Sequence, residues 1–382
     1  MTKICVAVAL FALITFVVCS MVFAQESRFV ETEHEEEERL PELEDQEDKE
    51  GREEAQTFLQ SLLEKTTLSG FVELDYDYAD VSDVADKNSG STSDLNLDEI
   101  ELELEVNLNE WVQAEMAVTA EDLGTDDHKI ALDEVTLTIE CPWIPLYFTG
   151  GKTSLRLTDF EDRLVSDTLI EELYEIDIVG YALGFAPDAY GLDLSITLYE
   201  GDKVIDNLAD FGTHEFRLER EEEDGISFIV NAVIEPIEEM LTLCAFYDSE
   251  PGDANRNDSI GGALTLDVWK FSLDAAYITA QGREAGEDGE ENKESVSVVG
   301  LAFQPFESTP LAFAVRYEDF DDDRHGDQDE VLDYLYLGGF KYSFLEWATL
   351  FFEYRYLGYE KERGSHAADE VDELHCRIGL EF

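Results

Sequence analysis

The sequence has few basic residues for its length. Lys and Arg together number 25 among 382 residues, against 91 Asp and Glu, so the formal net charge is −66. Proteins that bind nucleic acids use Lys and Arg to neutralise phosphates, and proteins that dock on anionic lipids use a basic face. We therefore expect no nucleic-acid partner and no docking on anionic lipid of that kind. The acidic balance is compatible with cations, with metal ions or with a high-salt habitat.

Long apolar runs are confined to the N-terminus. Lys3 is followed by an apolar stretch from Ile4 to Cys19, and Val22-Phe23-Ala24 fits the small-residue rule of a cleavage site. We predict a signal peptide over residues 1–24, with the mature chain starting at Gln25. Later stretches fall short of the roughly 18 uncharged apolar residues that a membrane helix requires, so none is expected in the mature chain.

Cysteine and histidine are also scarce. Beyond the signal peptide the Cys are Cys141, Cys244 and Cys376, which are far apart and odd in number. Such a set fits neither a zinc site nor a disulfide framework, so we interpret all three as small apolar residues on strands. Most His fall in expected loops or in the acidic N-terminal stretch, away from any nucleophile. We predict no catalytic residue, no enzyme activity, no cofactor and no dedicated metal site.

Residues 25–66 differ in composition from the rest of the chain. Residues 25–56 are acidic and of low complexity, and they contain too little apolar surface to fold alone. Phe58, Leu59, Leu62 and Leu63 then recur at helical spacing, which predicts a short amphipathic helix over residues 57–66. We expect a periplasmic acidic arm and a short helix that lead into one domain of residues 67–382.

In this domain, apolar and polar residues alternate in short segments. From Ile100 to Leu108 every second residue is Ile, Leu or Val, and the residues between them are Glu or Asn. The last segment, from Leu374 to Phe382, has the same pattern and ends on an aromatic residue. Side chains alternate between the two faces of a strand, so each segment has one apolar and one polar face. An apolar outer face and a polar lumen face are typical of transmembrane β-barrels.

The connections between these segments alternate between short and long. Short turns are expected at 107–110, 141–145, 187–191, 235–239, 267–270, 304–309 and 344–346, and long polar loops lie between them. Both ends of such a barrel lie in the periplasm, so the strand number is even. Residues 201–225 must then form one long outer loop, within which we expect an irregular hairpin. The predicted fold is an all-β, antiparallel, up-and-down transmembrane barrel of about 16 strands.

Two aromatic features support the barrel. Trp111, Trp143, Trp269 and Trp347 each lie at or beside a short turn, as expected for an aromatic girdle at one membrane–water interface. Phe382 ends the closing strand, which we expect to pair with the first strand at residues 68–78.

Two sets of charged residues are candidates for the pore. The first set consists of lumen-facing carboxylates, which favour cations: Glu101, Glu103, Glu105, Glu115 and Glu134. The second set lies in residues 150–175, where a long loop folding into the lumen would form a constriction with a transverse field: Lys152, Arg156, Asp159, Arg163, Asp167, Glu171 and Glu172. A solvated outer loop is the alternative interpretation of this second set.

The run from Gly150 to Glu175 resembles a segment of the LbtU-type outer-membrane siderophore porins, the legiobactin-receptor family. The likeness rests on a glycine–basic segment followed by Ser166-Asp167-Thr168-Leu169-Ile170-Glu171-Glu172-Leu173-Tyr174-Glu175, and on strands at Leu132–Val135 and Gly70–Asp75. It is specific over residues 130–176 and extends in layout over residues 66–382. The resemblance implies a barrel of about 16 strands that passes siderophores or other solutes without a full plug domain and without catalytic residues.

These features together predict an integral outer-membrane porin of a Gram-negative bacterium. We expect passive, cation-preferring passage of small solutes, with siderophores among them. The expected partners are outer-membrane lipid and lipopolysaccharide, the barrel-assembly machinery that reads the strand ending at Phe382, and the solutes; a homo-oligomer is left open. The alternative is a structural or adhesive barrel whose acidic N-terminal arm binds a periplasmic partner.

Overall fold

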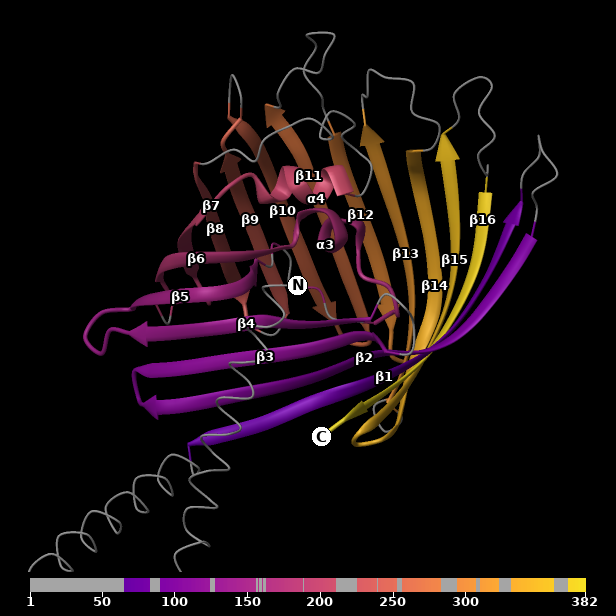
Figure 1. Cartoon of the computed structure of the whole chain (residues 1–382), viewed down its shortest axis with the longest axis horizontal. Helices are drawn as coiled ribbons and strands as arrows, with labels where there is room; N and C mark the ends of the chain where they lie inside the picture. Colours follow the sequence, from indigo (N-terminus) through magenta and orange to yellow (C-terminus); the bar gives the residue numbers. More distant parts are fainter. Residues whose placement is uncertain are drawn as a thin grey trace, which may run out of the picture. The chain divides into compact units, whose positions relative to one another are not determined.

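The described part of the chain forms a closed antiparallel barrel. A computed structural model describes residues 65–382 apart from 83–89, 124–127, 156, 158–159, 161–162, 188, 211–224, 239, 253–255, 283–293, 307–309, 323–330 and 361–369. Sixteen strands pair in chain order around the barrel (Figure 1), so the predicted fold is confirmed. The predicted signal peptide (1–24), acidic arm (25–56) and nearly all of the predicted helix (57–66) lie outside the described residues.

The elements have the following bounds. The strands are β1 (Thr66–Ser82), β2 (Gly90–Asn109), β3 (Val112–Leu123), β4 (Lys129–Glu140), β5 (Leu146–Leu155), β6 (Ile176–Phe185), β7 (Asp193–Glu200), β8 (Ile226–Ile237), β9 (Leu241–Glu250), β10 (Asn257–Val268), β11 (Phe271–Gly282), β12 (Glu294–Phe303), β13 (Leu311–Asp322), β14 (Val331–Leu345), β15 (Ala348–Glu360) and β16 (Glu370–Glu381). Two helices, α3 (Leu169–Tyr174) and α4 (Lys203–Asp210), follow β5 and β7. Neither of these helices of the described chain is long and apolar enough to cross a membrane.

The last strand closes the barrel against the first. β16 pairs with β1 over Phe71–Ser82 and Glu370–Glu381. Pairing continues to the end of the chain, because the Phe382 N–H donates to the Gly70 carbonyl at 3.0 Å and the Gly70 N–H donates to the Phe382 carbonyl at 3.2 Å. A side chain at position 70 would lie only 2.9 Å from the Phe382 ring and 2.4 Å from the Glu101 carbonyl oxygen. Glycine is therefore needed where the two ends of the barrel meet.

Short and long connections lie at opposite ends of the barrel, as predicted. β7 pairs directly with β8, so residues 201–225 form a single long connection, and the strand number is even. This connection begins with helix α4, which the sequence pattern did not predict. The hairpin expected within it falls on residues 211–224, outside the described part of the chain.

The outer surface of the barrel is apolar. Large apolar side chains that point outward remain exposed, among them Leu102, Val179 and Leu301. The four Trp lie at the β2–β3, β4–β5, β10–β11 and β14–β15 turns and are 47 to 86% exposed. An apolar belt bordered by Trp at one rim is the surface expected for contact with lipid and its interface.

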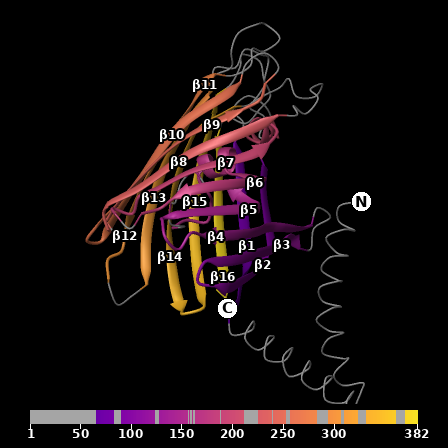
Figure 2. The ribbon, with the colours of Figure 1, turned by 90° about the vertical axis from the view of Figure 1, so that its left-hand side faces the viewer.

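The inside of the barrel is divided into a polar and an apolar part. Both helices lie inside the barrel wall (Figure 1), which Figure 2 shows from the side, and they pack on inward-facing apolar side chains of the wall. The buried helix residues are Leu169, Ile170, Leu173, Tyr174, Val204, Ile205 and Leu208, and their wall partners include Ile229, Ile278, Val296, Val298 and Leu335. The expectation of a polar lumen face is therefore wrong for this part of the wall. Each fully buried side chain of this size contributes about 1.5–3 kcal/mol, so the cluster fixes the helices in the lumen.

Candidate functional site

Residues 163–175 of the β5–β6 connection, here called the lumen segment, lie inside the barrel. The segment contains helix α3, which begins after the N-cap residue Thr168. The Thr168 hydroxyl accepts from the Glu171 N–H, and the Glu171 carboxylate accepts from the Thr168 N–H at 2.6 Å. This capping box satisfies two backbone donors at the helix start. The predicted candidate Glu171 is therefore a helix cap.

Buried carboxylates of the wall hold the backbone of the lumen segment. Glu353 of β15 is fully buried and accepts from the N–H groups of Val165 at 3.0 Å and Ser166 at 3.3 Å, and from the Ser166 hydroxyl. Glu318 of β13 accepts from the Leu169 N–H at 2.6 Å, at the first turn of α3. A carboxylate is favourable there because the N-terminus of a helix carries partial positive charge.

The same arrangement holds helix α4. Glu250 of β9 is fully buried and accepts from the N–H groups of Val204 at 2.8 Å and Ile205 at 3.1 Å. The Tyr199 hydroxyl donates to the same carboxylate at 2.9 Å. We did not single out any of these wall carboxylates from the sequence. For Glu318 and Glu353 the signal is a carboxylate on the inward side of a strand whose inward neighbours are apolar or basic, as with Phe351 and Arg355 around Glu353.

Basic residues of the wall complete the docking. Arg316 donates to the carbonyl oxygens of Ser166 at 2.8 Å and Asp167 at 2.5 Å. Arg163 of the lumen segment forms an ion pair with Asp274 of β11 and lies 3.8 Å from a carboxylate oxygen of Asp267. The lumen segment is thus fixed along β11–β15 and does not fill the part of the lumen on the opposite side.

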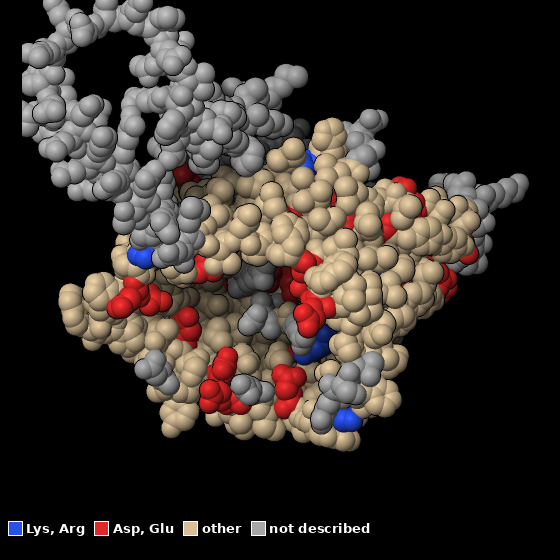
Figure 3. Space-filling view, turned by 90° about the horizontal axis from the view of Figure 1, so that it is seen from below, with Lys and Arg blue, Asp and Glu red and all other residues tan. Residues whose placement is uncertain are grey.

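A cavity, here called the passage, lies between the lumen segment and the wall of β1, β2 and β14–β16. Its volume is about 620 Å³. The charged residues that line it are Glu73, Glu103, Asp167, Glu346 and Glu381 against Lys341 and Arg377. The view from the short-turn end shows acidic side chains gathered around the mouth of the barrel (Figure 3). Acidic groups therefore outnumber basic groups in the lining of the passage.

The predicted lumen carboxylates lie on the inner wall of β2–β4. Their hydrogen bonds with polar side chains on the same face of the sheet show this. Glu103 accepts from Ser69 at 3.0 Å, Glu105 from Asn107 at 2.5 Å and Glu115 from Gln113 at 2.7 Å. Glu134 accepts from Thr136 and from Thr153, each at 3.3 Å. Glu101 lies between Glu99 and Glu103 on β2 and pairs with Phe71 of β1. Glu103 lines the passage itself, and the others extend the acidic face along the barrel wall.

Two cations of the second predicted set, Lys152 and Arg163, do not line the passage. Lys152 belongs to strand β5, and its ammonium group donates to Asp177 at 2.8 Å and to the Leu132 carbonyl at 2.7 Å. Arg163 is held by the barrel wall. The expected transverse arrangement of loop cations and loop acids is therefore wrong for these two residues, while Asp167 does line the passage. Arg156 and Asp159 lie outside the described residues.

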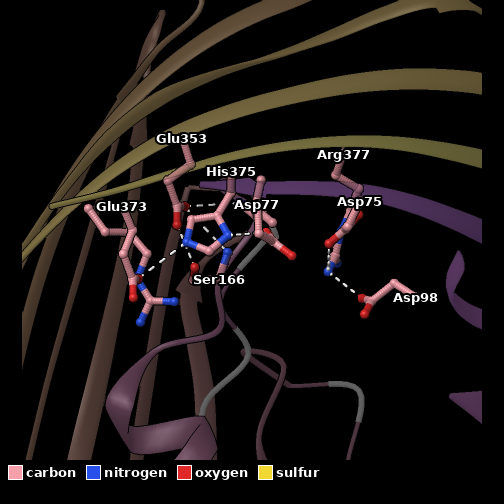
Figure 4. Close-up of polar contacts among 10 residues, drawn as sticks. Asp75, Asp77, Asp98, Ser166, Glu353, Glu373, His375 and Arg377 are labelled. Atoms are coloured by element: carbon pink, nitrogen blue, oxygen red, sulfur yellow. Dashed lines mark hydrogen bonds and ion pairs between the residues drawn. The ribbon is translucent and has the colours of Figure 1, made fainter. Parts of the chain in front are cut away.

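Strand β16 supplies a charged cluster that the sequence did not single out (Figure 4). The Arg377 guanidinium lies 2.6 Å from Glu73, 2.8 Å from Asp75 and 2.9 Å from Asp98, which belong to β1 and β2. Next along the strand, His375 Nδ1 lies 2.5 Å from Asp77 Oδ1. Both residues stand on the polar face of the alternating last strand, and their acidic partners lie mainly on β1, with Asp98 on β2 and Glu373 on β16 itself.

Comparison with known proteins identifies the fold. No protein-family model and no curated protein sequence matches the chain. Among solved structures, the chain is similar to an anion-selective porin from Comamonas acidovorans (10% identity, TM-score 0.58, covering 83% of this chain and 99% of that one). It is also similar to the outer-membrane channel DcaP of Acinetobacter baumannii (11%, 0.61, 83% and 97%) and to OprB of Pseudomonas putida (10%, 0.60, 85% and 96%). At these identities the likeness is one of fold, and the fold of this chain is the sixteen-stranded barrel of outer-membrane porins.

Proposed function

We propose that the chain is an integral outer-membrane porin that gives passive, cation-preferring passage to small solutes. The observation that carries the proposal is the passage beside the inward-folded lumen segment, with acidic groups in excess along its lining. One side of it is built by β1 and β2, which with the adjoining β3 contain many Asp and Glu but no Lys, Arg or His. Carboxylates in a narrow aqueous lumen attract cations and repel anions.

Ion preference has to come from the side chains, because the fold does not determine it. The solved structures that share this barrel include a porin described as anion-selective. Here the Arg377 charge is already shared among three carboxylates, so the basic groups do little to offset the acidic wall. The resemblance of residues 130–176 to LbtU-type siderophore porins adds siderophores to the proposed solutes. The acidic lining favours neutral or cationic siderophores over anionic ones.

The proposal includes the surroundings of the barrel. The exposed apolar belt supports contact with outer-membrane lipid, lipopolysaccharide or a second copy of the chain. Phe382 ends a strand that must find β1 during closure, which supports recognition of that strand by the barrel-assembly machinery. Residues 25–66 would then lie on the periplasmic side, where the short turns and the C-terminus are.

Neutralising the acidic wall is expected to reduce cation preference. In planar bilayers under a KCl gradient, the wild-type barrel should show discrete conductance with K⁺ preferred over Cl⁻. The triple variant Glu103→Gln, Glu115→Gln, Glu134→Gln should lower the permeability ratio about two- to fivefold, as expected for partly screened charges. Glu238→Gln at the exposed β8–β9 turn is the control. A folded barrel without conductance would refute the porin proposal, and preference for Cl⁻ would refute the ionic part.

Acid is expected to weaken cation preference in part through Glu172. The Glu172 side chain is exposed to the lumen, and displacement of water by the surrounding barrel raises its pKa from 4.5 to about 7; the nearby Glu318 and Asp167 carboxylates add to the effect, while Arg355 opposes it. Glu172 is therefore mainly charged at pH 8 and mainly neutral at pH 5. Reversal potentials at these two pH values should show stronger cation preference at pH 8, and Glu172→Gln should show a smaller difference than the wild type. An equal difference in both proteins would exclude this role for Glu172.

The same shift predicts how docking of α3 depends on pH. Below pH 4.5 the Glu172 carboxyl is protonated whether α3 is docked or released. Between pH 4.5 and about 7 the Glu172 carboxyl is ionised in the released helix but still largely protonated in the docked helix. Rising pH therefore stabilises the released helix and weakens docking. Above about pH 7 both forms are charged, and no further change is expected from this group.

A further inference from the structure

The inner wall of the passage has a gap at Gly379. In the register of the sheet, Gly379 of β16 is paired with Glu73 of β1 and with Thr349 of β15. A Cβ placed on Gly379 would lie 3.9 Å from a Glu73 carboxylate oxygen and 3.9 Å from the Phe351 ring, which are ordinary van der Waals distances. Because Gly379 lines the cavity, its missing side chain leaves this room beside a carboxylate and an aromatic ring to a solute.

The surroundings of this gap combine acidic and apolar groups. Phe71, Phe351 and Glu381 line the same passage from the barrel wall. Leu164 and Val165 line it from the lumen segment. Porin lumen faces are usually polar, so inward-facing Phe side chains beside carboxylates are a distinct feature of this wall. A solute here would meet an apolar surface and negative charge together.

The charges around the gap favour a cation over an anion or a zwitterion. The guanidinium of Arg377, two residues before Gly379 on β16, is held by Glu73, Asp75 and Asp98; the last two partners are labelled in Figure 4. The Lys341 ammonium lies 5.2 Å from the centre of the Phe351 ring, a distance that permits a cation–π contact. Lys341 occupies one face of the ring, and Phe351 also lines the cavity, so the rest of the ring faces the space that a solute would enter. A carboxylate on a solute would be repelled by the excess of acidic groups.

We propose that the gap around Gly379, with Phe351 and Glu73, is a binding site for amphipathic organic cations, in which an aromatic or alkyl group is joined to a protonated amine. The apolar group occupies the space against Phe351, and the ammonium group lies toward the Glu73 carboxylate. The proposal rests on the proposed channel function and deepens it, because lumen charge alone does not distinguish between monovalent cations of similar size. The site would slow and select such cations on their way through the passage.

Block of the K⁺ current by phenethylammonium tests the site. In single-channel recordings, phenethylammonium should interrupt the current at concentrations about tenfold below those needed for methylammonium or phenylacetate, as apolar burial and a cation–π contact imply. Gly379→Val, which fills the gap, and Phe351→Leu, which removes the ring, should each weaken the block several-fold. Gly338→Val on the outward side of β14 and Phe306→Leu in the β12–β13 turn are the matched controls, and the folded state of every variant is checked by its heat-modifiable migration.

The outcomes separate this inference from the proposed function. A cation-selective channel whose block is unchanged in Gly379→Val and Phe351→Leu overturns the site and leaves the porin intact. Equal block by phenylacetate or by zwitterionic phenylalanine overturns the assignment to cations. If the folded barrel does not conduct, the porin proposal fails, and titration calorimetry of phenethylammonium with the detergent-solubilised barrel then decides the site directly. Heat of binding that is lost in Gly379→Val supports the site, and its absence in the wild type refutes it.

Discussion

Glu353→Ala is expected to release the lumen segment and to raise the conductance of the channel. The Glu353 carboxylate is fully buried. It accepts from the backbone N–H groups of Val165 and Ser166 and from the Ser166 hydroxyl. Hydrogen bonds to a charged group contribute about 1.5–3 kcal/mol each, but bonds that share one carboxylate are not additive, so the variant should weaken docking by about 3–5 kcal/mol. The freed N–H groups then favour a conformation in which water reaches them, and the segment no longer narrows the passage.

Two measurements follow the release of the lumen segment. Single-channel conductance should increase, and a water-soluble thiol reagent should modify Cys244 faster. The Cys244 thiol lies 3.2 Å from the carbonyl oxygen of the buried Leu157, just before the lumen segment, so its reactivity reports on that contact. The labelling is done with Cys141 and Cys376 replaced by Ser.

Two further variants serve as controls for Glu353→Ala. Glu353→Gln, which keeps an acceptor oxygen without the charge, should give an intermediate result. Glu238→Ala, in an exposed turn, should behave as the wild type. Unchanged conductance together with unchanged labelling of Cys244 would show that Glu353 does not hold the segment.

The fold was predictable because its determinants are local. A strand exposes alternate side chains to opposite faces, so the pattern from Ile100 to Leu108 identifies an outer and an inner side without any knowledge of neighbours. Turn lengths and strand parity then set the strand number and the place of the C-terminus. Strand ends were less predictable: β1 runs over Thr66–Ser82, whereas the pattern is clear only over residues 68–78. Beyond Tyr78 the residues of β1 no longer follow the alternation of the preceding segment.

The lumen segment was predictable as a loop of interest, but its contacts were not. Ser166 is 187 residues away in sequence from Glu353, and nothing local to either residue indicates the other. Lys152 illustrates the opposite error, because it lies next to the loop in sequence but is still within β5 and pairs with Asp177 of β6. An acidic side chain can thus pair with another group of the protein, as Asp177 does with Lys152. The number of acidic residues alone therefore overestimates how many of them attract ions.

The wall carboxylates show what part of that excess does instead. Glu250, Glu318 and Glu353 satisfy backbone donors of the two helices or of the lumen segment, where no neighbouring strand can do so. An unpaired N–H in this apolar half of the barrel would cost about 1–3 kcal/mol. Part of the acidic excess therefore holds the lumen segment and the two helices from β9, β13 and β15, and another part, such as Glu103 of β2, lines the passage.

The second large effect is expected at the closing seam, in Arg377→Met. The guanidinium contacts Glu73, Asp75 and Asp98 within 3.0 Å, and the Asp75 side chain is only 6% exposed. Removing the one cation leaves three carboxylates to repel one another across β16, β1 and β2. Loss of one partner from a buried ion pair costs about 3–5 kcal/mol, and access of lumen water reduces this to about 2–4 kcal/mol. The barrel should therefore unfold at lower urea concentration and lose heat-modifiable migration at lower temperature.

A double variant tests whether the loss of stability in Arg377→Met comes from electrostatic repulsion and not from lost side-chain packing. Asp75→Asn combined with Arg377→Met removes one carboxylate together with the cation, so it should recover part of the urea midpoint lost in Arg377→Met. Arg377→Lys keeps the charge but cannot reach three carboxylates with a planar fork of donors, and it should fall between the wild type and Arg377→Met. Lys129→Met, at the exposed start of β4, should leave the midpoint unchanged. If the double variant is no more stable than Arg377→Met, repulsion at the seam is not what Arg377 relieves, and the cluster acts through packing alone.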